Sequence, residues 1–480
     1  MLYQNVSKYG LATHLALAAA LPAALAQFVS NGILACTILW VSLIALFWFL
    51  MEPSVFSGET VSGARSRVVR GVLKDPIAWF FLFAILFAFV RWLNSGVRLV
   101  FDAEKSIWSV AEAAIPFLPA SSGSEGFLPL ALAVAIAVVV LGVKHALGRN
   151  ARLWFGIFAG AISATGALAA VICAGLDMAP FNASALSGFG AISFPGSMFA
   201  MFLLLTVACG IEAEGRGMTK ARLVFAWGVA GNVMGSFVFL PSLLSIAYLS
   251  LSVIVAVIEL AVLKRYAGAA TTARAASMIA FGVIVAVFVV MMPQYSDIQA
   301  KKSEGFDVEK AFPPALSDRN EALCRIAKVM WLEQPWAGVG VGAFGMHAQF
   351  CASKEDWTVL PPDPKEGSNG YFTIIAERGI VGAIVWVVAI GLLVWFWVSR
   401  LIGSFVWQKS QDEGRSWLLN VPVVVWVGPL VMVSCLADAW FSASFSRTPL
   451  PLCAVAAMVL GAASFPKVKK IKSVDKAKKE

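Results

Sequence analysis

The side chains of this chain that are best suited to chemistry lie in one long polar stretch, residues 293–372, and directly after it. Arg319 and Arg325 fall inside the stretch, and Arg378 follows its end. A guanidinium bonds phosphate oxygens through two parallel N–H groups and keeps its charge at every physiological pH. These arginines are therefore candidates for binding a phosphate-bearing substrate, although each could instead form an ordinary ion pair with a nearby carboxylate.

One histidine and three carboxylates are candidates for a general base. His347 lies in the polar stretch, whereas the other two histidines, His14 and His145, fall in segments that we assign below to the opposite side of a membrane. A neutral imidazole can take a proton from a hydroxyl group. The carboxylates Asp363, Glu366 and Glu377 compete with His347 for this role. The plain alternative for His347 is a loop histidine that is hydrogen-bonded to the backbone.

The polar stretch is embedded in a strongly apolar chain. Of its 480 residues, 59% are hydrophobic and 14% are charged, and the mean hydropathy is +0.80. This composition lies outside the range of soluble domains, and apolar runs long enough to cross a bilayer as helices recur along the chain. We predict an all-α polytopic membrane protein with about twelve transmembrane helices, at residues 11–29, 32–51, 76–93, 127–144, 153–175, 194–212, 223–240, 242–263, 275–293, 379–399, 418–437 and 448–464.

The order of these segments predicts four parts. We expect transmembrane helices one to nine in residues 1–293, one large extracytoplasmic loop in 294–378, helices ten to twelve in 379–464, and a basic tail in 465–480. Short loops rich in Lys and Arg stay in the cytoplasm, and most of the 37 Lys and Arg residues fall on the same side as both termini. Both termini are therefore expected in the cytoplasm, and the large loop in the periplasm of a bacterial inner membrane.

The net charge of +9 is explained by the same loops and tail. Basic cytoplasmic segments face the anionic headgroups of membrane lipid, so the charge does not indicate a nucleic-acid partner. One alternative concerns the first span, because Lys8, an apolar run and residues 24–26 (ALA) also resemble a secretory signal with its cleavage site. Its removal would leave the orientation of the later helices unchanged.

Two outer segments have helical spacing. Residues 107–115 place apolar side chains at intervals of three and four, which predicts a helix on the membrane surface or on the top of the bundle. Residues 318–331 have a plausible N-cap and the same periodicity, and a turn at 334–336 should end that helix.

The seven cysteines divide into two groups. Five fall in or beside apolar spans, where Cys behaves as a small hydrophobic residue. Cys324 and Cys351 lie in the outer loop, where an oxidising compartment would favour a disulfide between them. Because no CxxC pair or His/Cys cluster offers metal-ligand spacing, we expect neither a metal nor a cofactor.

Four closely spaced glycines, Gly338, Gly340, Gly342 and Gly345, resemble a phosphate-binding loop. Such a loop needs a preceding strand and a βαβ unit, and nucleotides are not available outside the cell. Close backbone packing, or backbone N–H groups that face a lipid-linked phosphate, explain the glycines better.

Because nucleotides are not available outside the cell, a transferase at this face needs a donor that arrives through the bilayer. A polyprenyl pyrophosphate glycan meets that need.

Two strings around these glycines are the most specific part of the sequence. Residues 333–344 read EQPWAGVGVGAF, and residues 368–382 read SNGYFTIIAERGIVG. With Arg319 ahead of them, they resemble the signature of the O-antigen ligase and polymerase family. In that family an arginine-led helix runs into a P-x-x-G-V-G-x-G-x-F turn, and an H-N-x-Y string ending in E-x-G-x-x-G leads into the next transmembrane helix. The strong part of the resemblance spans residues 319–382.

The resemblance implies an activity and further site residues. Members of the family join a glycan carried on undecaprenyl pyrophosphate to an acceptor at the periplasmic face, without a metal or nucleotide. The acceptor is lipid A core, another glycan repeat unit or a protein. By position in the second string, Ser368, Asn369 and Tyr371 are expected to contact the substrate, and Glu377 matches the family's own glutamate.

Two departures from the family pattern affect these expectations. Where ligases of the family have a histidine that is proposed to activate the acceptor hydroxyl, this chain has Ser368, and serine cannot act as that base. The arginine usually found at the outer end of a mid-chain span is absent from residues 240–243 (LPSL), so one pyrophosphate ligand is missing. These departures favour a polymerase over a ligase, or an acceptor that is activated in another way.

We therefore expect a membrane glycosyltransferase, a ligase or a polymerase, that inverts the anomeric carbon of its donor. A glycan flippase or transporter is an alternative, but its ionisable residues should lie at mid-depth in several spans, and Asp177, Glu259 and Asp438 lie toward helix ends. A third alternative is an inactive relative that acts as a partner in polysaccharide assembly.

Overall fold

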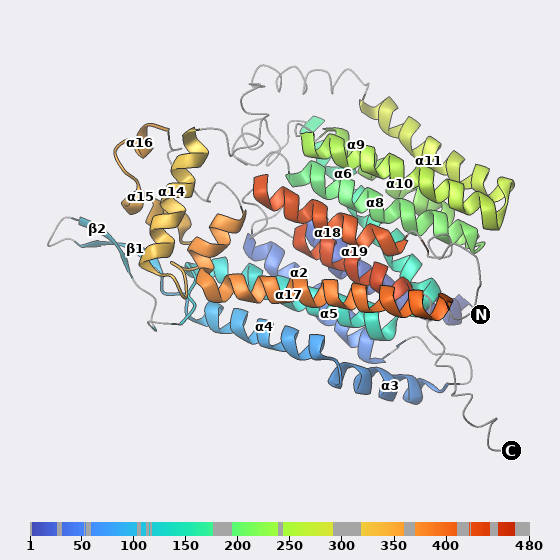
Figure 1. The fold of residues 1–480 in the computed structure, drawn as a ribbon, viewed down its shortest axis with the longest axis horizontal. Coiled ribbons are helices and arrows are strands. Elements are labelled where there is room, and N and C mark those ends of the chain that lie inside the picture. The colour runs from blue at the N-terminus through green and yellow to red at the C-terminus, as the bar shows by residue number, and fades with distance from the viewer. Residues whose placement is uncertain are drawn as a thin grey trace.

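The chain forms a bundle of long apolar helices that carries a small polar assembly at one end (Figure 1). This computed structural model describes residues 2–25, 31–51, 53, 59–102, 107–111, 115, 118–175, 194–238, 243–290, 318–359, 370–409, 422, 424–441 and 450–465. Residues 466–480 of the predicted basic tail and residues 294–317 and 360–369 of the predicted loop lie outside these ranges. Asp177 and residues 240–242 lie outside them as well.

Twelve apolar helices of the described part match the twelve predicted spans. They are α1 (Leu2–Leu25), α2 (Asn31–Met51), α4 (Pro76–Leu93), α5 (Phe127–Leu141), α6 (Arg149–Gly175), α8 (Phe194–Gly215), α9 (Arg222–Val238), α10 (Leu243–Ala267), α11 (Ala269–Val290), α17 (Gly370–Lys409), α18 (Val424–Phe441) and α19 (Leu450–Ser464). Six helices in the described ranges are long and apolar enough to cross a membrane: Gly32–Met51, Pro76–Leu93, Phe127–Ala146, Arg149–Cys173, Met198–Gly215 and Gly370–Val406. The protein is thus a largely α-helical, multi-pass membrane protein, and the number of twelve crossings stays a prediction.

Helix α4 illustrates how the sequence sets these elements. The Asp75 side chain accepts the N–H of Ile77, and Pro76 takes the first helical position, a combination that starts helices. One face of α4 exposes large apolar side chains at intervals of three and four residues: Trp79, Leu82, Phe83 and Leu86. Because such a face is stable only against hydrocarbon, we expect it to contact lipid, while the opposite face buries Arg91.

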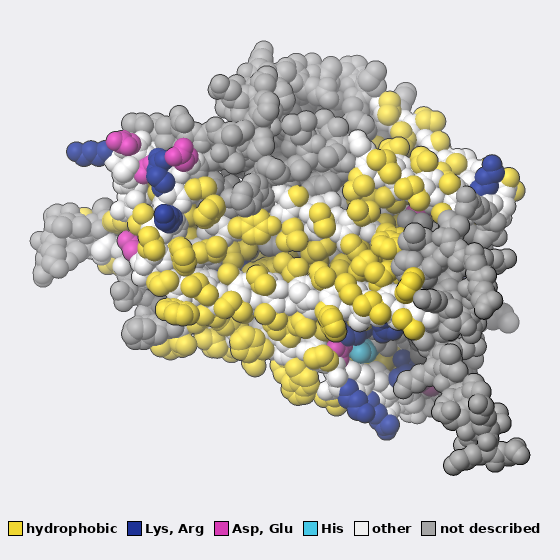
Figure 2. All heavy atoms as spheres, in the orientation of Figure 1, with side chains coloured by type: hydrophobic (Ala, Val, Ile, Leu, Met, Phe, Trp, Pro, Cys, Tyr) yellow, Lys and Arg dark blue, Asp and Glu magenta, His cyan; other side chains and the backbone are white. Residues whose placement is uncertain are grey.

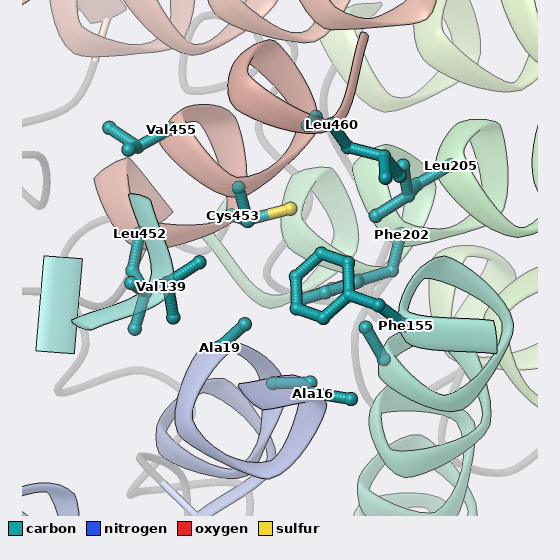
Figure 3. Packing of buried hydrophobic residues seen from close by; sticks show 14 of the residues in the cluster. Ala16, Ala19, Val139, Phe155, Phe202, Leu205, Leu452, Cys453, Val455 and Leu460 are labelled. Atoms are coloured by element: carbon teal, nitrogen blue, oxygen red, sulfur yellow. The ribbon is translucent and has the colours of Figure 1, made fainter. Parts of the chain in front are cut away.

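Small side chains and tight packing fill the centre of the bundle (Figure 3). Ala16 of α1, Phe155 of α6 and Cys453 of α19 belong to one continuous buried cluster. Gly156 of α6 lies so close to Cys209 of α8 that an added Cβ would overlap the sulfur. Small residues let membrane helices approach closely and gain van der Waals contact.

Figure 2 shows how polar and apolar side chains divide the visible surface. Apolar side chains cover the side of the bundle as a broad band, and charged side chains gather on the polar assembly and near the lower edge beside α3 (Val61–Leu73). A band of this kind is what the hydrocarbon core of a bilayer requires.

The polar assembly consists of short elements at one end of the bundle, of which α14 and α15 contact α17. They are β1 (Arg98–Asp102), β2 (Ile107–Ala111), the 3₁₀ turn η1 (Gly123–Gly126), α14 (Asp318–Glu333), α15 (Phe344–Cys351) and α16 (Asp356–Val359). Ile326 and Met330 of α14, Phe344 of α15 and Ala376 of α17 share a second, smaller buried cluster. The predicted helix at 318–331 is confirmed, and it ends at Glu333, directly before the predicted turn.

The predicted helix at 107–115 is wrong. Residues 107–111 form strand β2, which pairs antiparallel with β1 so that Phe101 lies opposite Trp108. Both strands are rich in β-branched and aromatic residues, which favour an extended backbone when a partner strand is present. Over five residues, helical spacing and strand alternation cannot be told apart, and the pairing with β1 decided the outcome.

A buried ion cluster joins the N-terminal end of α4 to the π-turn η2 (Gly142–Ala146). Asp75 Oδ2 lies 2.6 Å from Lys144 Nζ and 2.7 Å from His145 Nε2. Burial raises the pKa of Asp75, but the hydrogen bonds from His145 and Lys144 outweigh that effect and lower the pKa to about 2. His145 is therefore part of a structural cluster at the end of α4 remote from Arg91. The remaining short element is the 3₁₀ turn η3 (Thr219–Ala221).

Candidate functional site

Backbone hydrogen bonds hold the glycine turn, residues 334–343, against the N-terminal part of α17. Val339 N–H donates to Ala376 O at 2.9 Å, and Gly340 N–H donates to Glu377 O at 3.1 Å. In the reverse direction, Ile380 N–H donates to Pro335 O at 2.9 Å. These bonds hold together the two strings that carried the family resemblance.

The glycines of this contact are required by space. Gly338 and Gly379 both have a positive φ, 73° and 60°, a region that glycine enters without steric cost. A Cβ on Gly338 would overlap the backbone of Glu377, and a Cβ on Gly379 would overlap the carbonyl of Trp336. Gly379 also interrupts the helical dihedrals of α17. Close backbone packing, one of the two predicted explanations for the glycines, is confirmed.

The other explanation, a turn whose N–H groups face a phosphate, is wrong for residues 338–343. Each of these six N–H groups has an acceptor within the protein. Val341 N–H donates to Ala120 O at 3.0 Å, and Ser122 N–H donates back to Val341 O at 2.8 Å, so the turn is paired on both edges. A phosphate could bind these N–H groups only by breaking their existing hydrogen bonds, and the turn would then lose its conformation.

Glu377 is part of this framework. Its side chain is fully buried, and Oε1 accepts the N–H of Gly342 at 3.1 Å. A carboxylate that is buried and bonded to the glycine turn is well placed to fix the start of α17.

Arg378 follows Glu377 and turns into the bundle. It is 6% exposed and lines a pocket between α4, α5, α17, α18 and α19. Its Cζ lies 6.0 Å from the centre of the Trp386 ring. Gly382, one turn later, makes room for it, because a Cβ there would overlap the Cβ of Arg378. Gly382, the last glycine of the second string, thus leaves space for the Arg378 side chain.

A second arginine, Arg91, enters the same pocket from the last turn of α4. It is 3% exposed, and its Nε and Nη2 are buried without a hydrogen-bond partner in the described part of the chain. Its Cζ lies 4.7 Å from the centre of the Phe87 ring. Arg91 also lies within electrostatic reach of Arg378 and Glu377. Two buried cations, Arg91 and Arg378, thus lie near the buried carboxylate of Glu377.

The rest of the pocket is apolar. Away from the two arginines its walls include Phe80 and Phe81 of α4, Leu132 and Ile136 of α5, and Ile390 and Leu393 of α17. Leu393 lies 15 positions after Arg378 on α17, which corresponds to about 22 Å of helix. The arrangement suits an amphiphilic anion: the arginines would bind its charged head, and the long apolar walls would accept a hydrocarbon tail.

The sequence missed Arg91, although a signal was present. It is a single charge in the final turn of an 18-residue apolar helix, and ionisable residues inside a span are functional candidates by default.

His347 lies on α15, eight positions after Val339 of the glycine turn. It is partly buried, and burial lowers the pKa of its imidazole. The neutral ring, the form that accepts a proton, is therefore favoured at neutral pH.

Arg325 and Arg319 both belong to α14. Arg325 donates to Asp356 Oδ1 at 2.7 Å and to Glu321 Oε1 at 2.9 Å. Burial raises the pKa of Asp356, but the hydrogen bonds from Arg325 and Ser353 outweigh that effect and lower it. The guanidinium of Arg325 thus connects α14 to α16. The backbone of Arg319 lies in the first turn of α14, and its side chain lies outside the described part of the structure.

Of the three predicted substrate contacts in the second string, the structure describes only Tyr371. Tyr371 donates its hydroxyl to Leu436 O at 2.7 Å and so connects α17 to α18. Ser368 and Asn369 lie outside the described residues. The structure therefore brings Glu377 and Arg378 together with Arg91, and it places Arg325 in a separate ion-pair network.

Cys324 and Cys351 do not form a disulfide with each other in this structure. Cys351 Sγ lies 4.0 Å from Glu333 Oε2, and burial raises the pKa of its thiol to about 11. Among the residues that the structure describes, no group of three or more His, Cys, Asp or Glu side chains could hold a metal ion.

Comparison with known proteins adds a finding that is independent of the geometry. Residues 230–387 match a family model described as O-Antigen ligase. The matched segment contains α14, the glycine turn, Glu377 and Arg378. No curated protein matches the chain.

Proposed function

We propose, from the premise that residues 230–387 belong to the O-antigen ligase family, that this protein is a membrane glycosyltransferase of polysaccharide assembly. Its donor would be a glycan on undecaprenyl pyrophosphate, and transfer would occur at the periplasmic face of the bacterial inner membrane. No metal takes part in the proposed step.

One observation carries this proposal: Arg91 and Arg378 are buried together at the polar end of a long apolar pocket. Buried charges are stable only when they are paired, and Arg91 has two nitrogens without a partner in the described structure. A pyrophosphate would supply negative charge and hydrogen-bond acceptors to these two nitrogens of Arg91, and its polyprenyl tail would occupy the apolar walls. Arg91 would thereby take the place of the family arginine that is missing at residues 240–243.

The proposed reaction is an inverting displacement. The acceptor hydroxyl oxygen forms a bond to the anomeric carbon while the bond from that carbon to the pyrophosphate oxygen breaks. The hydroxyl proton passes to a base, and the lipid pyrophosphate leaves with the electron pair. Arg91 and Arg378 would stabilise the negative charge that grows on the leaving oxygen, an effect of roughly 3 kcal/mol for each well-placed donor.

His347 is the proposed base. The neutral imidazole is favoured by burial, whereas Glu377 is engaged in holding Gly342. With Ser368 in place of the family histidine, we favour a polymerase that uses a growing glycan as acceptor over a ligase that uses lipid A core. Arg325, paired with two carboxylates, is proposed to be structural, and Arg319, Asn369 and Tyr371 remain proposed substrate contacts.

The test compares two arginines on neighbouring segments. Purified protein receives undecaprenyl-pyrophosphate oligosaccharide, and lengthened glycan and released lipid pyrophosphate are measured. Arg91→Gln should lose about 10²-fold or more of the turnover, the usual cost of one such donor. Arg98→Gln, on the exposed start of β1, should keep it.

Two results would count against these assignments. Equal turnover of Arg91→Gln and wild type would remove the arginine pair from the site. A wild-type protein that is inert with every acceptor would favour an inactive relative that acts as an assembly partner.

A further inference from the structure

Glu259 is a carboxylate buried inside the bundle, far from the arginine pocket in the sequence and absent from its walls. It lies on α10 and is 3% exposed. Both of its carboxylate oxygens are inaccessible to solvent and have no hydrogen-bond partner in the described part of the chain. Helix α10 packs mainly on α8, and also contacts α11 and α9.

The charged groups on the neighbouring helices are engaged elsewhere. On α8, Glu212 pairs with Arg216 at 2.6 Å, and Glu214 pairs with Arg222 at 2.7 Å. Arg274 of α11 also lies 3.7 Å from Glu214. On α10 itself Lys264 is exposed, and the side chain of Arg265 lies outside the described structure. The described cations around Glu259 are thus directed to other carboxylates or to solvent.

Within the described part of the chain, the titratable groups that face Glu259 are an acid and a thiol. Glu212 and Cys209, both on α8, lie within electrostatic reach of Glu259. Cys209 is fully buried, and the Glu212 side chain is 15% exposed. A carboxylate without a donor, a cation or water is strongly destabilised in such a place, and the neighbouring negative charge of Glu212 adds to the effect.

We propose that Glu259 is a proton-binding site and carries its proton in the native state at neutral pH. The ligand is a proton from the end of the bundle that the basic loops predict to be cytoplasmic. Glu212 lies three positions before the end of α8 and is partly exposed, which makes it the described carboxylate best placed to pass a proton between solvent and Glu259. This proposal is independent of the glycosyltransferase assignment.

The primary test uses the pH dependence of stability. A native state that keeps a proton which the unfolded chain releases loses stability as pH rises above the usual pKa of Glu. Glu259→Gln removes that dependence while keeping the shape of the side chain. The melting temperature of the variant in detergent should therefore exceed that of wild type at pH 9, and the gap should close toward pH 5, with a change of at most about tenfold in the unfolding constant per pH unit.

Glu321→Gln is the matched control, because Glu321 is exposed on α14 and paired with Arg325. Its difference from wild type should be the same at pH 6 and pH 9. If the gap between Glu259→Gln and wild type is also constant over this range, Glu259 does not hold a proton and the proposal fails.

A second measurement identifies the protonated acid directly. A lipophilic carbodiimide adds to a neutral carboxylic acid in an apolar environment: the carboxyl oxygen bonds to the carbodiimide carbon, the acid proton goes to a nitrogen, and the adduct rearranges to a stable N-acylurea. Mass spectrometry after digestion should find this label on Glu259 of wild type at pH 7 and not on Glu321, which is exposed and paired with Arg325. A Glu259 that stays unlabelled at pH 7 would contradict the proposal.

Discussion

Burial of His347 sets the pH range in which this residue can accept a proton. Because burial lowers the pKa of the imidazole, the ring becomes neutral at a lower pH than an ordinary histidine does. A base must be neutral to act. Turnover should therefore rise with pH through a midpoint below the usual histidine value of about 6.5 and stay level through pH 8.

The measurement is kcat/KM between pH 5 and pH 9 for wild type and His347→Asn. We expect the variant to lose about 10²-fold or more of kcat and to lose the low-pH midpoint. A midpoint above the usual histidine value, or a variant with the wild-type profile, would assign the base to another group.

At the residue scale, the sequence showed which side chains could bind phosphate, but it did not show which other side chains they contact. Arg378 was found from its string, and the structure buries it in the pocket. Arg325 looked equally suitable, but Asp356, 31 positions away, takes its guanidinium. Arg91 stands outside both strings. The distances between such residues depend on tertiary packing, which residue type and spacing do not contain.

At the scale of elements, the contact between the glycine turn and α17 predicts a sharp difference between two glycines of one helix. Gly379 has a positive φ and lies against the carbonyl of Trp336, whereas Gly391 has no atom within 4 Å of an added Cβ. Gly379→Ala should lower the melting temperature and expose the polar assembly to protease. Gly391→Ala should leave stability unchanged or raise it by up to about 1 kcal/mol, the difference in helix propensity.

Thermal unfolding and limited proteolysis of both variants measure this difference in stability. A Gly379→Ala protein as stable and as protease-resistant as Gly391→Ala would show that the two strings are not held together in the way the structure indicates.

Long elements were easier to predict than short ones. The apolar runs and α14 each extend over many residues, and a helix of the described part overlaps each of them. Residues 107–111 were assigned to a helix because five residues cannot distinguish the two periods, and the partner strand lies in a different part of the loop. The paired edges of the glycine turn were also beyond the sequence, since Ala120 and Ser122 show no motif.

At the scale of the whole molecule, the orientation across the membrane is testable with two exposed lysines. In a background without native cysteines, Lys328→Cys on α14 should react with a membrane-impermeant maleimide in intact spheroplasts, because basic loops keep the other end of the bundle inside. Lys74→Cys, directly after α3, should react only after the membrane is opened. Both residues are exposed. The reverse pattern would invert the orientation and place the arginine pocket in the cytoplasm.

The paired edges of the glycine turn also bear on how proteins of this kind are classified. The glycines, Glu377 and the backbone of Ala376 serve the joint between two parts of the chain, and they fall inside the segment that matches the family model. A match to this family model therefore reports the architecture of this joint as well as any shared chemistry. Assigning a reaction to this protein requires residues outside the joint, such as Arg91, which lies outside the matched segment.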